Sequence, residues 1–173
     1  MIQSLLRQQL DAELACSREV LVAAQQAPLG WKPHEVSFPL GRLAMHVATI
    51  PSWMPAFTRG DGYDMGAGGP GPRMPATAAE ILEAYDDAVV RAHAVLDTLD
   101  DRALAEPWTL LRDGAPIATM PRAEAVSRYV VRHLVHHRGQ LTVYLRLCGI
   151  PVPALYGDSA DRRMLPPEAE VGA

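Results

Sequence analysis

The sequence predicts an all-α protein, a four-helix bundle with a small β-hairpin between the third and fourth helices. Two observations support this fold class: apolar residues recur at helical spacing in four long stretches, and Pro- and Gly-rich segments separate them. Because each amphipathic helix must bury its apolar stripe, a bundle is the architecture that such helices favour. The periodicity leaves open whether the bundle is a simple antiparallel one or contains a crossover.

The first helix is predicted over residues 2–26, where leucine and valine residues recur among polar residues at helical spacing. Strands would show strict alternation instead. Pro28, Gly30 and Pro33 then interrupt the pattern, so a loop is expected before the second helix.

The second helix is predicted over residues 39–59, where apolar positions continue at helical spacing. Pro51 and Pro55 each lack a backbone N–H donor, so we expect a kink or a restart at residues 49–52. Residues 60–76 contain six glycines and three prolines. This composition disfavours regular structure and predicts a flexible connection or a lid.

The third helix is predicted over residues 77–100. Thr77 precedes Glu80 by three residues, which is the spacing of a capping box at a helix start. Residues 105–121 break the helical pattern, and the Asp-Gly pair at 113–114 lies between two short apolar runs. Such a pair is a strong turn signal, so this segment predicts the hairpin.

The fourth and longest helix is predicted between Pro121 and Gly149, since proline favours a helix start and glycine a helix end. The tail that follows is rich in proline and charge. We expect its first part to pack on the bundle and the tail to be loosely structured from about residue 158. With 173 residues, the chain is expected to form a single domain over residues 1–173.

Composition narrows the class of partner. Sixteen Lys and Arg residues against 20 Asp and Glu residues give a formal net charge of −4, so no nucleic acid partner is expected. No apolar run approaches the roughly 20 residues of a membrane span, and no signal-like segment opens the chain. Cys16 and Cys148 are too few and too far apart for a disulfide framework. We therefore expect reduced thiols, a cytoplasmic location and no membrane partner.

Three histidines lie close together in the fourth predicted helix: His133, His136 and His137. The spacing of His133 and His137 places their side chains about 40° apart around the helix axis, so both can face one point. Two neutral imidazoles one turn apart can bind a divalent metal ion. His46, inside the second helix on an apolar face, is the obvious third ligand.

Structural interpretations compete with this one. An HxxxH pair often arises by chance, and a lone histidine such as His46 on an apolar face is more often a core residue. His136 can support the site from outside, lie on the surface or exchange roles with a neighbour. His34 and His93 are expected to be structural or solvated.

Other chemistries lack their sequence motifs. The chain contains no GxxxxGK[ST], no strand followed by GxGxxG and no GxSxG. Cys16 and Cys148 occupy helix positions that look buried, which disfavours a covalent mechanism. The ExxH pattern of di-iron bundles is also missing, since Val130 and Leu134 stand where its glutamates would be. A mononuclear metal site fits better.

The segments RLAMHVATIPSWM, DGYDM, PWTLLRDGAPIATMPR and HLVHHRGQLTVYLRLCGIPVPALYG resemble the DinB-like superfamily of metal-binding four-helix bundles. The resemblance spans roughly residues 38–157. It implies one metal ligand on the second helix and two on the last, which correspond to His46, His133 and His137. Some members of that family use low-molecular-weight thiols, as S-transferases or as a thiol-dependent isomerase, and others are described as metal-dependent hydrolases. The family also implies a homodimer.

The first functional hypothesis is an enzyme that holds one divalent metal ion per chain and activates a thiol or water against a small-molecule substrate. Zinc, nickel, iron and copper all suit three imidazoles, and a low-molecular-weight thiol is the implied cosubstrate. The alternative is a non-catalytic, stress-related bundle that binds a metal or a small ligand. A third interpretation is a bundle that keeps the histidines and binds no metal in the cell.

Further residues have two interpretations each. Arg138 either orients substrate or forms an ion pair, on the surface or between helices, and we favour the ion pair. Gln140 either orients substrate or supports the helix. Trp53 and Tyr144 either line the pocket or belong to the core. Carboxylates that orient the imidazoles are expected from the third helix, which offers Glu83, Asp86 and Asp87.

Overall fold

The computed structural model describes residues 1–67 and 71–164. These residues are mostly helical and include a small three-stranded sheet. The elements in chain order are α1 (Ile2–Ala24), α2 (Leu40–Thr49), the 3₁₀ helix η1 (Ile50–Phe57), β1 (Gly62–Asp64), the 3₁₀ turn η2 (Met65–Ala67), α3 (Ala79–Leu96), α4 (Asp101–Ala105), β2 (Pro107–Arg112), β3 (Ala115–Pro121), α5 (Arg122–Val126), the π-helix η3 (Ser127–Arg132) and α6 (His133–Leu147).

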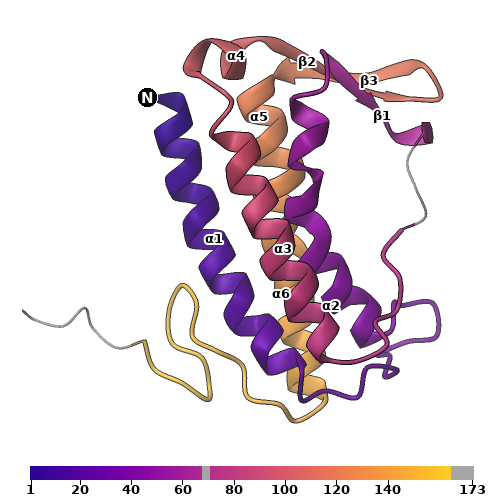
Figure 1. Ribbon diagram of the computed structural model, residues 1–173. Coiled ribbons are helices and arrows are strands. Elements are labelled where there is room, and N and C mark those ends of the chain that lie inside the picture. The colour runs from indigo at the N-terminus through magenta and orange to yellow at the C-terminus, as the bar shows by residue number, and fades with distance from the viewer. Residues whose placement is uncertain (68–70, 165–173) are drawn as a thin grey trace, which may run out of the picture.

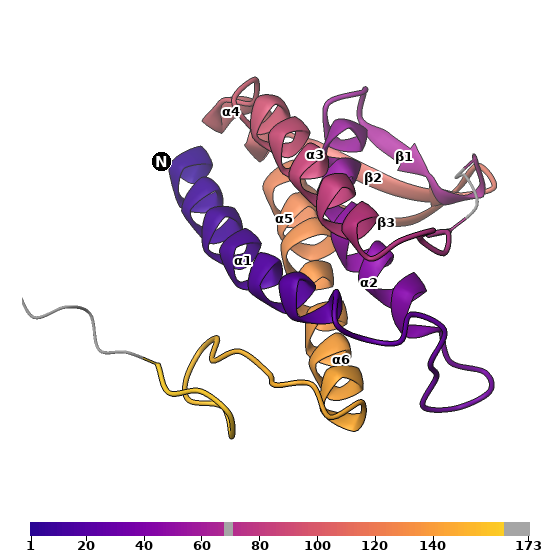
Figure 2. The ribbon, with the colours of Figure 1, turned by 60° about the horizontal axis from the view of Figure 1, so that its bottom comes forward.

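The longest helices lie side by side, and the sheet covers one end of them (Figures 1 and 2). Helix α6 contacts both α1 and α2, and α3 contacts α1, α2 and η1. The core between them consists of fully buried side chains such as Leu10, Val47, Ile81 and Leu141. Each comes from a different helix, so burial of apolar surface is what holds the helices together.

The second helical segment changes type where the prolines predicted a break. Helix α2 ends at Thr49, and the 3₁₀ helix η1 continues to Phe57 with Pro55 inside it. The Thr49 hydroxyl donates to the carbonyl of Met45 at 2.9 Å, a bond that competes with regular helix geometry. The predicted restart at residues 49–52 is therefore confirmed, and it carries the chain from the helices to the sheet.

The predicted hairpin is confirmed and gains a third strand. Strands β2 and β3 pair antiparallel, and β1 pairs parallel with β2. The turn residues Asp113 and Gly114 have φ angles of 52° and 79°, as expected for a two-residue hairpin turn. The Asp64 carboxylate accepts three hydrogen bonds from the backbone N–H groups of Gly66, Asp113 and Gly114 at 2.7–2.9 Å, so it ties β1 to this turn.

Strand β1 corrects the prediction that residues 60–76 contain no regular structure. A Cβ atom at Gly62 would lie 2.5 Å from the carbonyl oxygen of Thr109, so the close approach of β1 to β2 requires glycine here. The glycine content that suggested a loop is thus partly a packing requirement. Residues 68–70 of the predicted connection lie outside the described residues.

The third and fourth helical segments are each more divided than predicted. Helix α3 ends at Leu96, and the separate short helix α4 follows, with the Asp100 side chain accepting from the Ala103 N–H at 2.7 Å as its N-cap. The segment between Pro121 and Gly149 is helical, but residues 127–132 form a π-helix. It ends with Gly149 at a φ of 71°, the left-handed geometry that favours glycine after a helix.

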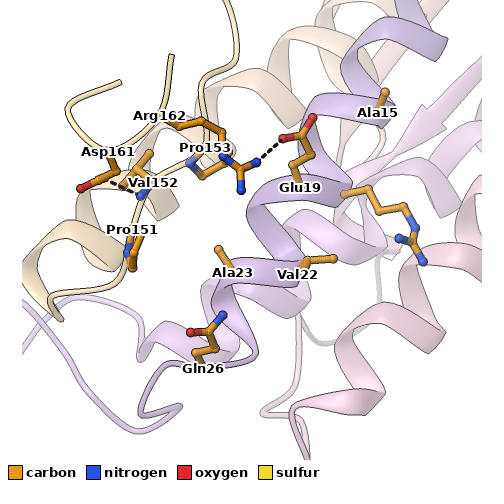
Figure 3. Close-up of a pocket in the computed structure, with 11 residues that line it drawn as sticks. Ala15, Glu19, Val22, Ala23, Gln26, Pro151, Val152, Pro153, Asp161 and Arg162 are labelled. Atoms are coloured by element: carbon orange, nitrogen blue, oxygen red, sulfur yellow. Dashed lines mark hydrogen bonds and ion pairs between the residues drawn. The ribbon is translucent and has the colours of Figure 1, made fainter. Parts of the chain in front are cut away.

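The segment after α6 runs back along α1. Pro151, Val152 and Pro153 line a groove beside α1, and Arg162 forms an ion pair with Glu19 at 3.7 Å (Figure 3). The backbone N–H of Val152 donates to the Asp161 carboxylate at 2.8 Å. The tail was predicted to be loosely structured from about residue 158, but Asp161 and Arg162 make these specific contacts. Residues 165–173 lie outside the described part. Within the described residues, no helix is long and apolar enough to cross a membrane.

Candidate metal centre

Helices α2 and α6 bring three histidines together at one point. His46 lies in α2, one turn before its end, while His133 and His137 occupy the first turns of α6. One potential ligand atom from each residue lies within 4.8 Å of the other two. His46, His133 and His137, the three residues predicted as metal ligands, are called the histidine cluster below.

The spacing within the histidine cluster matches that of imidazoles around one ion. The Nε2 atoms of His46 and His133 are 3.3 Å apart, and the ring centroids are separated by 4.4–5.1 Å. Two nitrogens bound tetrahedrally to the same zinc ion at about 2.0–2.1 Å would be about 3.4 Å apart. An N–H···N hydrogen bond between two neutral rings also has this length, so the distance fits both a metal-bound and a metal-free pair.

Burial keeps the histidine cluster neutral. Burial, with a smaller contribution from the neighbouring imidazoles, lowers the pKa of His46 and of His133 from 6.5 to about 4. Burial also lowers the pKa of His137, against a hydrogen bond to Gln140 that works in the opposite direction. Neutral imidazoles keep a lone pair for a metal ion near pH 7.

One ring nitrogen of the cluster has no partner. His46 is 8% exposed, and its Nδ1 atom is buried without a hydrogen bond to any described residue. A buried polar atom left unsatisfied costs about 1–3 kcal/mol. The donor set and this unpaired nitrogen fit a site that takes a bound group.

Trp53 packs against the histidine cluster and is itself partly exposed. This side chain from η1 is 37% exposed, and its ring centroid lies 4.9 Å from that of His133 and 5.7 Å from that of His46. His133 and His137 are half-buried, and His136 next to them is exposed. Trp53 therefore forms a wall of the site, as one of its two interpretations predicted.

The groups that orient the imidazoles are not the predicted carboxylates. Asp86 pairs with Arg18 at 3.1 Å and Asp87 lies 3.9 Å from Arg91, and no hydrogen bond within the described residues joins α3 to the histidine cluster. Gln140 takes this role at His137, because its Oε1 lies 2.8 Å from the His137 Nδ1 atom. The position of Gln140 three residues after His137 is the sequence signal for this contact, since side chains three apart on a helix are neighbours.

Arg138 belongs to a separate polar group on the side of α6 that faces α1. Its guanidinium, 1% exposed, forms an ion pair with Glu13 of α1 at 2.6 Å and donates to the Ser17 hydroxyl at 3.1 Å. The Tyr156 hydroxyl accepts from Arg138 and donates to Glu13. The favoured interpretation, an ion pair on the surface or between helices, is confirmed in its interhelical form. Arg138, Glu13, Ser17 and Tyr156 are called the arginine cluster below.

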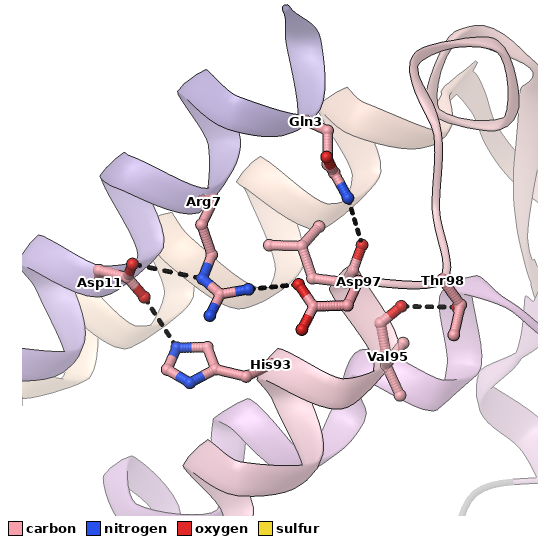
Figure 4. Close-up of polar contacts among 8 residues, drawn as sticks. Gln3, Arg7, Asp11, His93, Val95, Asp97 and Thr98 are labelled. Atoms are coloured by element: carbon pink, nitrogen blue, oxygen red, sulfur yellow. Dashed lines mark hydrogen bonds and ion pairs between the residues drawn. The ribbon is translucent and has the colours of Figure 1, made fainter.

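The remaining candidates lie away from the histidine cluster. His93 Nε2 is 2.7 Å from an oxygen of Asp11 on α1 (Figure 4), and His34 Nδ1 accepts from the backbone N–H of Val36. Tyr144 packs edge-on against Trp31 with centroids 5.6 Å apart, which supports its core interpretation. These residues have structural contacts, as expected for His34 and His93.

A feature that the sequence did not reveal precedes His133. The π-helix at residues 127–132 ends where α6 begins, so it sets the rotation at which both α6 histidines enter the site. Single π-helical turns are rare and occur often at functional sites. Hydrophobic periodicity does not distinguish a short π turn from a continuous α-helix, so no sequence signal marked it.

Cys16 and Cys148 are free thiols that are half-buried, less buried than predicted, and Cys148 lies just after the end of α6. Burial raises the pKa of each thiol, which disfavours the reactive thiolate. The low expectation for a covalent cysteine mechanism therefore agrees with the structure.

Comparisons with known proteins identify the family. Residues 19–168 match the DinB family. In structure, the chain is similar to a DinB-like protein from Bacillus subtilis, with a TM-score of 0.57 and 17% sequence identity over 83% of this chain and 96% of the other; at this identity the likeness shows the fold alone. A comparison with curated proteins gives no match. Because the family match covers most of the sequence, the chain belongs to the DinB family.

Proposed function

We propose that the chain is a metal-dependent enzyme in which His46, His133 and His137 hold one divalent ion. The observation that carries this proposal is the convergence of three neutral imidazoles from two helices, with ligand atoms within 4.8 Å of one another. Within the described residues, no fourth His, Cys, Asp or Glu side chain joins this group. Catalytic metal sites keep such an open position, whereas structural sites are closed by a fourth protein ligand.

We expect zinc, nickel or iron at this site, since imidazole donors suit each of them. When bound, such an ion lowers the pKa of a thiol or water in its open position and so supplies a nucleophile near neutral pH. This chemistry corresponds to an S-transferase that uses a low-molecular-weight thiol, or to a hydrolase.

The surrounding residues define what the site offers a substrate. Trp53 presents a partly exposed apolar ring beside His46 and His133, so it packs against an apolar part of a small molecule. Gln140 holds His137 from the exposed side of α6. The lowered pKa values keep the three imidazoles themselves uncharged near pH 7.

The family likeness extends this proposal to the whole molecule. We expect the longest helices to form the DinB four-helix bundle, and two copies of the chain to pair as a homodimer in the cytoplasm. Sedimentation of the purified protein measures the oligomeric state directly.

The test is elemental analysis of protein purified without an affinity tag, comparing the wild type with His46→Ala. We expect about one ion per chain in the wild type and none in the variant. His34→Ala is the matched control, because His34 lies in the exposed loop before α2, and it should keep the ion.

If the wild type holds no ion and fails to bind added zinc or nickel, the metal-dependent proposal is wrong and a non-metal binding bundle replaces it. If the ion is present, low-molecular-weight thiols are then tested with electrophilic small molecules. An ion without turnover would support the non-catalytic metal-binding alternative.

A further inference from the structure

Gln140 joins two histidines on the exposed side of α6. Its Oε1 atom lies 2.8 Å from Nδ1 of His137, and its Nε2 atom lies 3.1 Å from Nε2 of His136. The three residues stand three and four positions apart on one helix, so their side chains are neighbours. Both ends of the carboxamide are thus engaged by imidazoles.

These two contacts assign the protons. A carboxamide oxygen only accepts, so Nδ1 of His137 carries the proton that it donates to Gln140. The carboxamide nitrogen only donates, so Nε2 of His136 offers its lone pair. In a neutral imidazole one nitrogen is protonated and the other is not. His137 is therefore left with an unprotonated Nε2 atom.

The reversed carboxamide would have the opposite effect. With its nitrogen facing His137, Gln140 would donate to Nδ1, and the proton of the neutral ring would move to Nε2. That ring would have no lone pair at Nε2, the nitrogen that Gln140 does not contact. In the orientation found, the Gln140 nitrogen lies 3.1 Å from Nε2 of His136, so the oxygen faces His137.

We propose that Gln140 is a positioning residue that fixes the Nδ1-protonated tautomer of His137 and so presents the Nε2 lone pair to the histidine cluster. The inference rests on the proposed function, since it assigns this tautomer to a metal ligand. Partners of this kind typically change metal affinity about 10- to 100-fold when they are removed. Gln140 is exposed, so its replacement should leave folding intact.

The first test is a zinc titration against a competing chelator for the wild type, Gln140→Leu and Gln140→Glu. Leucine cannot accept the Nδ1 proton, so the variant should bind zinc about 10- to 100-fold more weakly. Glutamate accepts that proton with either oxygen, so its variant should bind at least as tightly as the wild type. Gln9→Leu makes the same chemical change at an exposed position of α1 and should change nothing. Equal affinity for Gln140→Leu and the wild type, or equal loss in both Gln140 variants, would overturn the proposal.

The second test needs no metal. In chelator-treated protein at about pH 8, where imidazoles are neutral, ¹⁵N NMR distinguishes protonated from unprotonated ring nitrogens. We expect His137 to be protonated at Nδ1 in the wild type and to redistribute its proton between the two nitrogens in Gln140→Leu. A wild-type His137 protonated at Nε2 would contradict the proposal. Because this readout is independent of metal, it also separates a failure of the tautomer assignment from a failure of the metal-site proposal.

Discussion

The histidine cluster and the arginine cluster share one helix, where His137 of the first is followed directly by Arg138 of the second, yet their polar groups are satisfied in different ways. Successive residues of a helix point about 100° apart, so one side chain faces α2 and the other faces α1. In the arginine cluster, a carboxylate, two hydroxyls and a backbone carbonyl satisfy the buried charge. In the histidine cluster, three neutral rings face one another and one buried nitrogen has no partner. The first arrangement is complete without a ligand, whereas the second is not.

This difference separates a structural role from a functional one within a single helix. A polar group whose partners are all supplied by the fold contributes to how the helices are held together. A polar group that the fold leaves unsatisfied costs stability unless something else binds there. The comparison therefore makes different predictions for the two clusters, taken here from the largest expected effect to the smallest.

The largest effect should come from breaking the arginine cluster. Arg138→Leu removes the cation from Glu13, whose side chain is only 17% exposed, and leaves that carboxylate without a positive charge beside it. Breaking a buried pair in this way costs about 3–5 kcal/mol. Urea denaturation measures the change in the free energy of unfolding.

The matched control for this prediction is Arg132→Leu. Arg132 is 60% exposed at its side chain and pairs with Glu124 on the surface at 3.1 Å, and such pairs contribute about 0–1 kcal/mol. Equal losses in the two variants would show that the arginine cluster is not the buried structural unit described above.

The histidine cluster should instead make the metal-free protein sensitive to acid. The pKa of His46 and of His133 is about 4 in the folded protein and 6.5 without burial. Between about pH 6.5 and pH 4, these two histidines are therefore protonated in the unfolded chain and neutral in the folded one. The free energy of unfolding is therefore unaffected by these two groups above pH 6.5, and it decreases as the pH falls from 6.5 toward 4.

One fully buried histidine with this shift changes the free energy of unfolding by about 3 kcal/mol between the two pH limits. His133 is partly exposed, so its contribution is smaller. Urea denaturation with a chelator present, repeated between about pH 7 and pH 4, measures this dependence. His46→Leu should flatten it, since one of the two groups is gone. An identical pH dependence in wild type and variant would contradict the prediction.

Metal should act on the histidine cluster alone. Zinc added to chelator-treated protein at a free concentration of about 100 times its dissociation constant should stabilise the fold by about 2.7 kcal/mol, because it ties α2 to α6. The melting temperature measures this gain. The same gain should appear in Arg138→Leu and be absent in His46→Ala. A gain that depends on Arg138 would mean that the two clusters are not independent.

The parts that could be predicted from the sequence are those set by local pattern. The HxxxH spacing placed His133 and His137 on one helix face, the apolar neighbours of His46 placed it inward, and the Asp-Gly pair located the hairpin turn. Strand β1 could not be predicted, because its parallel pairing with β2 joins residues far apart in the sequence, and its short glycine-containing segment shows no alternation.

The support of the site shows the same limit. Carboxylates of α3 were expected to orient the imidazoles because metal-bound histidines commonly bond to them, but helical periodicity does not determine which side of α3 faces α2. Gln140 lies on the same helix as His137 and contacts it through local spacing. The π-helix before His133 is a single short segment, so a pattern based on 3.6 residues per turn does not detect it.

The smallest effect is expected at His93, a histidine that belongs to neither cluster. Its ring contacts Asp11 at 2.7 Å, and Arg7 bridges Asp11 to Asp97 across α1 and α3 (Figure 4). These side chains are exposed or half-buried, so His93→Ala should lower the free energy of unfolding by less than about 1 kcal/mol. The metal content should stay the same as in the wild type. A loss of the bound ion in this variant would mean that a histidine outside the histidine cluster takes part in the site. The contrast between the satisfied arginine cluster and the unsatisfied histidine cluster would then no longer identify the functional residues.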